Sequence, residues 1–354
     1  MTTILAPVLH RSREAVRPAL QAAVDRLDPL TRAQVSYHLG WTEADGRPRG
    51  DGGGGGKALR PALALLGARA GGGREEPAVP SAVAVELVHN FSLLHDDVMD
   101  GDTERRHRAT VWSLWGTSSA ILAGDALMTL AQEVLLESGS PRTVPLVAEL
   151  LRATRELIRG QVQDLEFEQR HDVGLDECLS MVSGKTGALL AASAAMGAIS
   201  VGAPDATVAA LTAYGAHLGT AFQLVDDLLG IWGRPAETGK PVLSDLRARK
   251  KTVPVTCALS SDGPAARELA DLLRTAGPVR PGAGASPACG TPAEEAALRR
   301  AAALIEASGA RAWTAAEAQR RADAARAALD AVPLEPGARA ELDALAAFVV
   351  GREH

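Results

Sequence analysis

Apolar residues recur three or four positions apart along almost the whole chain, which is the spacing of amphipathic and buried helices. No stretch alternates apolar and polar residues for long enough to predict a strand, and no fixed-period repeat is present. Glycine clusters at 52–56 and 71–73, and Gly202-Ala203-Pro204, interrupt the helical pattern as loops do. The pattern predicts a single all-α domain over residues 1–354, with roughly ten or more helices.

One long interruption is rich in proline and glycine and lies in the C-terminal third of the chain. It covers Ala276–Pro292, and its composition predicts a flexible surface loop. Amphipathic helices are expected after it, at Ala293–Ser308, Ala310–Ala331 and Pro336–Val350.

The composition changes this picture only in detail. Alanine dominates the apolar residues and aromatic residues make up 3%, which favours closely packed helices with small side chains at their contacts. The net charge of -6 argues against a nucleic-acid-binding surface. The three cysteines, Cys178, Cys257 and Cys289, lie far apart, so we expect neither a disulfide framework nor a zinc site. This use of cysteine predicts a cytoplasmic location.

Two apolar stretches raise the question of a membrane. Near the N-terminus, His10, Arg11 and Arg13 interrupt the apolar run, so no signal peptide is expected. The longest uncharged run, Thr186–Pro204, is rich in Ala, Gly and Ser, and its weak hydrophobicity favours a buried core helix over a membrane span. We therefore expect no stable membrane insertion.

Three aspartates end the apolar run AVAVELVHNFSLL, in the sequence HDDVMD. On a helix Asp96 and Asp100 share a face, and Asp97 and Asp100 are also neighbours. Carboxylates this close repel one another unless a cation lies among them, and Mg²⁺ prefers one or two carboxylates with waters and phosphates. A single such motif is equally typical of a solvated helix end.

A second acidic motif makes the cation-binding interpretation stronger. Asp226 and Asp227 follow another apolar run, and Gln223 shares a helix face with Asp227. Two carboxylate-bearing helices of this kind could face each other across a pocket with metal between them. Basic residues lie near both motifs, at Lys57, Arg60, Arg105, Arg106, Lys185, Lys240, Lys250 and Lys251. A diphosphate held by Mg²⁺ on one side and by Lys or Arg on the other would satisfy both sets of charges.

Gly184-Lys185-Thr186 resembles the end of a Walker A loop, but a nucleotide site is not predicted. Leu179 stands where that motif requires glycine, and no strand is predicted before it.

Taken together, these motifs resemble the trans-prenyltransferase family, the isoprenyl diphosphate synthases, and in product type most nearly the geranylgeranyl diphosphate synthases. The resemblance runs from about residue 50 to residue 255, and the order and spacing of the motifs are specific. The shared motifs are G-K-x-x-R-P (Gly56–Pro61), H-x-x-S-L-L-H-D-D-V-M-D (His89–Asp100), R-R (Arg105, Arg106), G-K-T (Gly184–Thr186), F-Q-x-x-D-D (Phe222–Asp227) and T-G-K-P (Thr238–Pro241).

The resemblance implies an isoprenoid synthase type I fold, a helical bundle around a central apolar cavity, usually as a homodimer. It implies that Mg²⁺, or Mn²⁺, is bound by Asp96, Asp97 and Asp100 on one wall and by Asp226 and Asp227 on the other. An allylic diphosphate would be held by the metals with Arg105, Lys185, Thr186, Gln223, Lys240 and Lys250, and isopentenyl diphosphate by Lys57, Arg60, His89 and Arg106. The expected catalytic residues are these five aspartates with Arg105, Lys185, Gln223 and Lys240.

The implied reaction is a head-to-tail condensation of isopentenyl diphosphate with an allylic diphosphate. Taking up the negative charge that develops on the leaving diphosphate allows the allylic substrate to ionise. The carbocation is then attacked by the double bond of isopentenyl diphosphate, which the protein holds alongside it. An apolar pocket keeps water away from the cation.

The chain departs from the family pattern at two places. Gly230 stands where many members carry a third aspartate in the second motif, which puts the strength of metal binding there in doubt. Ala109 stands before Thr110 where a proline is commoner. Neither departure removes a predicted ligand.

Product length is expected to depend on the residues four and five before the first aspartate, Ser92 and Phe91. A bulky Phe91 beside a small Ser92, with no insertion in the motif, resembles enzymes that form the twenty-carbon geranylgeranyl chain more than those that form farnesyl. On a helical wheel with ~100° per residue, Phe91 lies ~140° round from Asp96, while Ser92 is nearly beneath it.

Three other functions are compatible with parts of the sequence. A di-iron bundle would use the Glu-x-x-His pairs Glu86/His89, Glu104/His107 and Glu168/His171, but it leaves both aspartate motifs and the basic motifs unexplained. A class I terpene cyclase needs the metal sites but not the isopentenyl diphosphate cations, which are all present. A non-catalytic partner subunit is expected to lack one aspartate pair, and both pairs are present.

Overall fold

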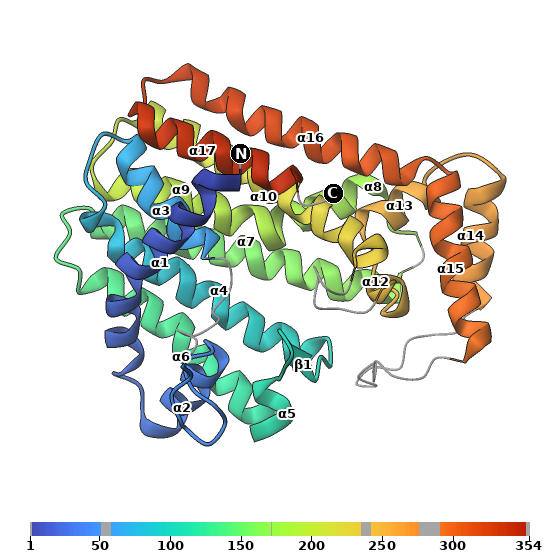
Figure 1. Ribbon diagram of the computed structural model, residues 1–354, viewed down its shortest axis with the longest axis horizontal. Coiled ribbons are helices and arrows are strands. Elements are labelled where there is room, and N and C mark those ends of the chain that lie inside the picture. The colour runs from blue at the N-terminus through green and yellow to red at the C-terminus, as the bar shows by residue number, and fades with distance from the viewer. Residues whose placement is uncertain (1, 51–57, 171, 235–241, 276–290, 352–354) are drawn as a thin grey trace. The chain divides into compact units, whose positions relative to one another are not determined.

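The computed structural model describes residues 2–50, 58–170, 172–234, 242–275 and 291–351 of the chain. These residues are almost entirely helical, and their only strands are a two-residue pair (Figure 1). The all-α prediction is confirmed. The contacts divide the chain into two compact units, each built from separate segments, and α7 (Thr143–Gln169) and α10 (Asp205–Trp232) contribute residues to both. The single-domain prediction stays a prediction.

Unit 1 comprises Met1–Arg155, Leu189–Gly215 and Arg326–Leu345. Its core forms around α4 (Val79–Met99), which packs against α6 (Thr117–Leu136) and α3 (Leu59–Ala70). The remaining elements before α7 are α1 (Thr2–Val24), α2 (Pro29–His38), a 3₁₀ turn (Glu76–Ala78), β1 (Glu104–Arg105), β2 (Arg108–Ala109) and α5 (Val111–Trp115). Late segments of the chain add α9 (Ala188–Ser200), a 3₁₀ turn (Leu329–Ala331) and most of α17 (Pro336–Val350), whose residues from Ala346 onward belong to unit 2.

Small residues allow two helices of unit 1 to cross with their backbones in near contact. A Cβ atom added at Gly67 in α3 would lie 2.3 Å from the carbonyl oxygen of Ala194 in α9, and one at Gly197 would lie 2.0 Å from that of Ala64. Neither site has room for a methyl group. The crossing confirms the expectation, drawn from the alanine-rich composition, of close helix contacts through small side chains.

Unit 2 comprises Glu156–Ala188, Ala216–Ala325 and Ala346–His354. Within it α13 (Val253–Leu259) packs against α8 (Leu175–Val182) and α14 (Pro264–Thr275), and α15 (Pro292–Ala307) packs against α14 and α12 (Ser244–Arg247). This unit also contains α16 (Ala310–Ala328) up to Ala325, and the last residues of that helix belong to unit 1.

The helices expected near the C-terminus are confirmed. Thr291 accepts a hydrogen bond from the backbone N–H of Glu294, Glu294 accepts one from the N–H of Thr291, and Pro292 occupies the first turn of α15. This capping box fixes the start of the helix. The proline- and glycine-rich loop predicted before it falls mainly on residues 276–290, which lie outside the described residues.

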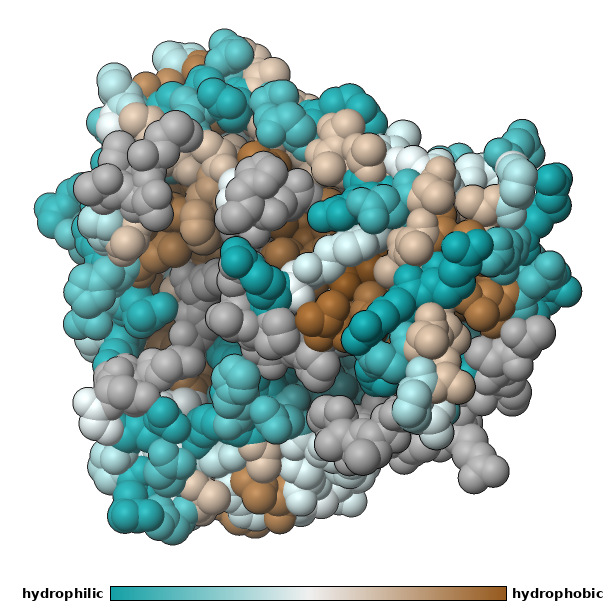
Figure 2. Space-filling view, turned by 45° about the vertical axis from the view of Figure 1, so that its right-hand side comes forward, coloured by the Kyte–Doolittle hydropathy of each residue, from teal (hydrophilic) through white to brown (hydrophobic). Residues whose placement is uncertain are grey.

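Two stretches are long and apolar enough to cross a membrane by length and composition, Thr117–Leu136 and Leu175–Ser200. The apolar window of Leu175–Ser200 is 78% buried within the protein, as a core helix is, and that of Thr117–Leu136 is 39% buried. On the face drawn in Figure 2, polar and apolar residues are interspersed. The expected absence of membrane insertion stays a prediction.

Candidate active site

The first acidic motif closes α4 in unit 1. Asp96 and Asp97 lie in its last turn, and Asp100 is its C-cap, with its backbone N–H donating to the carbonyl of Asp96 at 2.8 Å. Asp97 is 1% exposed, whereas Asp96 and Asp100 are partly exposed on one helix face. The motif therefore has one inner and two outer carboxylates.

The inner carboxylate is anchored by the arginine that follows the helix. Arg105 Nε donates to Asp97 Oδ1 at 2.7 Å, and among the described residues no group donates to the buried Oδ2 of Asp97. Burial raises the pKa of Asp97 to about 6, and the charge and hydrogen bond of Arg105 oppose that rise. A buried carboxylate with one oxygen left without a hydrogen bond is stabilised by a cation close by.

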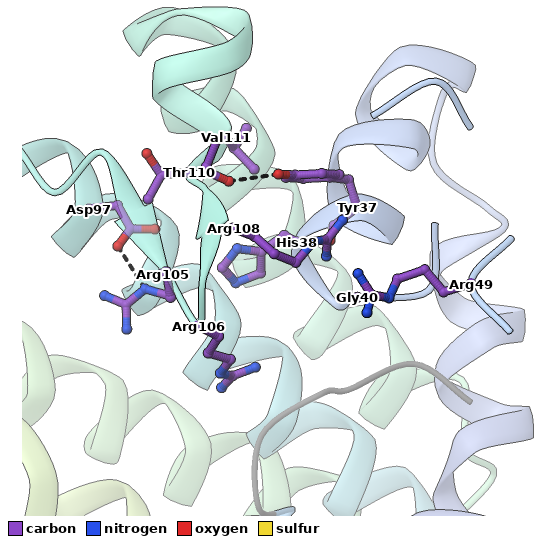
Figure 3. A pocket seen from close by; sticks show the side chains of 11 residues that line it. Tyr37, His38, Gly40, Arg49, Asp97, Arg105, Arg106, Arg108, Thr110 and Val111 are labelled. Atoms are coloured by element: carbon purple, nitrogen blue, oxygen red, sulfur yellow. Dashed lines mark hydrogen bonds and ion pairs between the residues drawn. The ribbon is translucent and has the colours of Figure 1, made fainter. Parts of the chain in front are cut away.

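The two arginines after the motif lie on a tight β-hairpin. Arg105 in β1 pairs with Arg108 in β2, which leaves Arg106 and His107 as a two-residue turn with φ of 53° and 59°. Left-handed conformations at both central positions match the twist of a hairpin, but each costs a non-glycine residue roughly 1–2 kcal/mol. Figure 3 shows the result: Arg105 is turned toward Asp97, and Arg106 points away from it.

Arg108 holds this strained turn in place. Its guanidinium donates to the backbone carbonyls of Tyr37 and Thr42, both at 2.7 Å, and lies 3.9 Å from the centre of the Tyr37 ring. The Tyr37 hydroxyl donates in turn to the carbonyl of Ala109 at 2.8 Å. These contacts tie the hairpin to the end of α2, which explains how the strain is maintained. The hairpin forms although Ala109 replaces the commoner proline.

A basic cavity of about 170 Å³ lies between this hairpin and the end of α2 (Figure 3). Four arginines line it with His38 and Asp97: Arg49, Arg105, Arg106 and Arg108. Burial, followed by the charges of the neighbouring arginines, lowers the pKa of His38 to about 3. His38 is therefore neutral at physiological pH.

Three of the four residues predicted for isopentenyl diphosphate come together in unit 1. His89 lies on α4, and its pKa is lowered well below the ordinary value by burial and then by the charges of Arg60 and Arg106. Arg60 lies in the first turn of α3. The fourth predicted residue, Lys57, lies outside the described residues.

Glu86 on α4 provides a counter-charge to these arginines. Burial raises its pKa, while Arg60 and Arg106 lower it, and Asn90 Nδ2 donates to Glu86 Oε1 at 3.2 Å. Because Glu86 and His89 both face arginine side chains, their surroundings suit an anion and disfavour the iron of a di-iron bundle. His171, which that alternative also requires, lies outside the described residues.

In unit 2 the G-K-T motif forms a π-helical segment, Ser183–Gly187, between α8 and α9. Insertions of this kind are frequent at functional sites. The helix α8 leads directly into the motif, where a Walker A loop follows a strand. Lys185 Nζ donates to Asp164 Oδ2 at 2.5 Å, so the lysine is held by a carboxylate on α7.

Hydrogen bonds connect three of the predicted residues of unit 2 in a chain. The Thr186 hydroxyl donates to Gln223 Oε1 at 2.8 Å, and Gln223 Nε2 donates to Asp227 Oδ1 at 2.8 Å. The other oxygen of Asp227 accepts from the backbone N–H of Val253, the first residue of α13, at 3.0 Å. The chain fixes the orientation of the Gln223 amide.

The second acidic motif repeats the inner and outer arrangement of the first. Asp227 is 4% exposed, and Asp226 is partly exposed. Burial raises the pKa of Asp227 to about 7, opposed by its two hydrogen bonds and reinforced by the charges of Asp245 and Asp226. Lys250, partly buried, lies shortly before α13, and Lys240 falls outside the described residues.

These carboxylates fit a magnesium ion. No three His, Cys, Asp or Glu side chains converge as a complete metal cage within the described ranges. Mg²⁺ does not require such a cage, because it usually binds one or two protein carboxylates and keeps waters and phosphates as its other ligands. In unit 1 the partly exposed Asp96 and Asp100 can serve as such ligands, and the orphaned Oδ2 of Asp97 also supports a cation there. In unit 2 the partly exposed Asp226 can serve as one.

The comparison with known families decides how these residues are to be interpreted. The model of the polyprenyl synthetase family matches residues 53–280, a range that includes both acidic motifs and the basic residues around them. The chain belongs to the polyprenyl synthetase family.

Individual polyprenyl synthetases are similar over most of the chain. A (2E,6E)-farnesyl diphosphate synthase of Mycobacterium tuberculosis is 50% identical over 353 residues, covering 100% of this chain and 95% of that protein. A geranylgeranyl diphosphate synthase of the same species is 46% identical over 268 residues, covering 75% of this chain and 76% of that protein. The crystal structure of a polyprenyl synthetase from Streptomyces coelicolor shares 49% identity, with a TM-score of 0.89 over 98% of this chain and 99% of the other. The predicted isoprenoid synthase fold is confirmed.

The residues predicted to set product length in this polyprenyl synthetase lie in the packed interior of unit 1. Phe91 is 6% exposed, and its ring meets that of His95 edge-on, with centroids 5.0 Å apart. Ser92 is also buried, and its hydroxyl donates to the carbonyl of His89 at 2.8 Å. His95 in turn contacts α6, where its Nε2 lies 3.0 Å from the carbonyl oxygen of Ile121.

Several residues of this polyprenyl synthetase site were missed from the sequence. Asp164, which holds Lys185, has only a weak signal: it and Gln161 are two polar residues three apart on an otherwise amphipathic helix. Arg108 was not singled out from the sequence, although it anchors the hairpin. His38 has no sequence signal, because its role depends on the distant arginines that α2 meets.

Proposed function

We propose that this polyprenyl synthetase condenses isopentenyl diphosphate head-to-tail with allylic diphosphates, using Mg²⁺. One observation carries the proposal: each unit joins acidic residues to groups that bind diphosphate. In unit 1, Asp97 is bonded to Arg105, and Arg60, His89 and Arg106 lie together. In unit 2, Thr186 and Gln223 are bonded in series to Asp227. Diphosphate and Mg²⁺ require these two sets of groups.

The proposed roles follow from the charges. Mg²⁺ bound at Asp96 and Asp100 in unit 1, and at Asp226 in unit 2, would supply positive charge to a diphosphate leaving group. Lys185, Lys250, Arg105 and the Gln223 amide bind the allylic diphosphate and stabilise the charge that develops on it. Asp97 and Asp227 orient Arg105 and Gln223. From the resemblance, Lys240 joins the cations around the allylic diphosphate.

Arg60, Arg106 and the neutral His89, with Lys57 by resemblance, bind isopentenyl diphosphate. The two arginines bind the charged oxygens, and a neutral imidazole donates a single hydrogen bond. Holding the second substrate in place replaces a bimolecular encounter during attack on the carbocation. This group also favours chain elongation over a class I terpene cyclase, which needs no second diphosphate.

For product length we propose the twenty-carbon geranylgeranyl chain. The proposal is supported by the bulky, buried ring of Phe91 and by the small Ser92, which follows it and lies beneath Asp96 on the helix. A farnesyl product is the second candidate, because a farnesyl diphosphate synthase is 50% identical over the whole chain. Phe91→Ala is expected to lengthen the product.

The experiment that tests the function is a Mg²⁺-dependent assay of the purified protein. Isopentenyl diphosphate is supplied with dimethylallyl, geranyl or farnesyl diphosphate in turn, and the products are separated by chain length. Elongation that stops when EDTA is added supports the proposal. Hydrocarbon formed without isopentenyl diphosphate would show a cyclase, and no turnover with any allylic substrate would refute both functions.

We also propose a homodimer in the cytoplasm. The support for the dimer is the surface of α6, where Ile121, Leu122 and Leu136 are 41%, 64% and 62% exposed. Apolar side chains repeated along one helix favour contact with another protein surface. The support for the location is that Cys178 and Cys257 are free thiols, as in a reducing compartment.

A further inference from the structure

Gly230 lies one helical turn after the second acidic motif, at the position where a third aspartate was expected from the family pattern. Positions 226 and 230 share a face of α10, so a carboxylate at 230 would lie beside that of Asp226. With glycine there, the acidic motif at the end of α10 has no third carboxylate.

The space of the missing side chain is taken by another aspartate of unit 2. A Cβ atom added at Gly230 would lie 2.0 Å from Asp245 Oδ2, 2.4 Å from its Cγ and 2.9 Å from its Oδ1. The Asp245 carboxylate thus occupies the volume that a side chain at 230 would fill. Glycine at 230 and aspartate at 245 are sterically complementary, since a larger residue at 230 would displace the carboxylate.

Two hydrogen bonds to the end of α10 place Asp245 there. The Leu243 N–H donates to the carbonyl of Ile231 at 3.3 Å, and the Ser244 hydroxyl donates to that of Gly230 at 3.2 Å. Leu243, buried and just before α12, has the left-handed φ of 65°, which costs a leucine free energy and persists only where the surroundings hold it. These hydrogen bonds therefore hold the short segment that carries the Asp245 carboxylate against the end of α10.

We propose that Asp245 is a positioning residue that replaces the third aspartate of the second motif and orients the waters of a Mg²⁺ bound at Asp226. The proposal rests on the proposed function of this site. Mg²⁺ retains several waters, and carboxylates that accept hydrogen bonds from metal-bound waters strengthen binding without being ligands. An outer carboxylate of this kind agrees with the absence of a three-ligand cage among the described residues.

The test measures metal binding directly. The full-length protein is titrated with Mn²⁺ in the presence of inorganic diphosphate, and free Mn²⁺ is followed by its electron paramagnetic resonance signal. We expect Asp245→Asn to weaken Mn²⁺ binding about 10- to 100-fold, the range found when supporting carboxylates are removed. Asp262→Asn, the same change on an exposed loop residue of unit 2, serves as the matched control and should bind Mn²⁺ as the wild type does.

A transplanted carboxylate makes the test specific. Asp245→Ala removes the carboxylate and frees the space, and adding Gly230→Asp returns a carboxylate to α10. The double variant should regain Mn²⁺ affinity to within about threefold of the wild type, in contrast to Asp245→Ala alone. Circular dichroism melting shows that each variant is folded.

Two results would overturn the proposal: Asp245→Asn binding as tightly as the wild type, or a folded double variant no better than Asp245→Ala. The single Asn variant, which keeps the size of the side chain, decides the question if the double variant fails to fold. A wild-type protein that turns over its substrates while Asp245→Asn binds Mn²⁺ normally would refute the role of Asp245 alone. A wild-type protein that neither binds Mn²⁺ nor turns over would refute the proposed function as well.

Discussion

The substitution Gly160→Ala should disable the enzyme from a position on α7 that is not expected to touch a substrate. Gly160 lies against the π-helical segment, and a Cβ atom at this position would lie 2.2 Å from the backbone nitrogen of Lys185 and 2.7 Å from its Cα. Both obstacles are backbone atoms, so no side-chain rotation relieves the contact. The segment that carries Lys185 has to move away from α7.

The size of the movement follows from ordinary contact distances. An added methyl group needs at least 3.4 Å, so the Lys185 backbone must shift by about 1.2 Å. A shift of this size lengthens the 2.5 Å contact of Lys185 with Asp164, and it also displaces Thr186 next to it. Misplacing a catalytic group by ~1 Å can cost ~100-fold in kcat, and overpacking costs about 1–3 kcal/mol of stability.

The assay is steady-state elongation with the allylic substrate varied, combined with thermal melting. We expect kcat to fall about 100-fold while the KM for isopentenyl diphosphate, proposed to bind in unit 1, stays near the wild-type value. Gly187→Ala is the matched control, since a Cβ there would lie 3.5 Å from the nearest atom, the carbonyl oxygen of Ala216. Folded Gly160→Ala protein with kcat within threefold of the wild type would show that Lys185 does not need its present position.

Four further outcomes are expected. His107→Gly should raise the urea midpoint by relieving the left-handed turn, worth about 1 kcal/mol; a lower midpoint would contradict the strain. Burial raises the pKa of Cys178 to about 12, so at pH 8 Ellman's reagent should modify it more slowly than the half-buried Cys257, as peptide mapping can show. The folded pKa of Asp227, about 7, exceeds the ordinary 3.8, so the folded state binds the proton more tightly and the metal-free protein should gain stability as pH falls from 8 to 5. Asp227→Asn should flatten that dependence in melting curves, and an unchanged slope would assign it to other groups. Leu122→Glu should convert the dimer to a monomer in sedimentation velocity, whereas an unchanged dimer would place the interface elsewhere.

Short-range sequence patterns were sufficient to predict most of the helices. Helical periodicity and the glycine breaks at 71–73 and 202–204 depend on neighbours within a few positions, and these features appear where they were expected. The capping box at Thr291, which was not predicted, depends on equally local contacts. The hairpin at 104–109 was not predicted, because the two residues of its turn, Arg106 and His107, are not the Asn or Gly that favour such turns. Arg108 and Tyr37, far apart in sequence, hold it instead.

The candidate site was predictable by residue type but not by role. Asp96 and Asp97 are chemically identical in the sequence, and only packing makes Asp97 the buried partner of Arg105. Likewise Asp227 is bonded to Gln223 and Val253, while Asp226 remains partly exposed. The prediction that the two acidic helices face each other across one cavity stays a prediction, since the structure defines each unit by itself.

The crossing of α3 and α9 through Gly67 and Gly197 has a consequence for variants of this protein. Where backbones already touch, the harmful change is an increase in side-chain size, and trimming a large residue elsewhere leaves more freedom to adjust. In a random library, inactive members should therefore be enriched in Gly and Ala positions that gained atoms. Many of these positions would lie on α3, whose first turn carries Arg60. A change there is remote from the chemistry and looks conservative, yet it would inactivate the enzyme through packing.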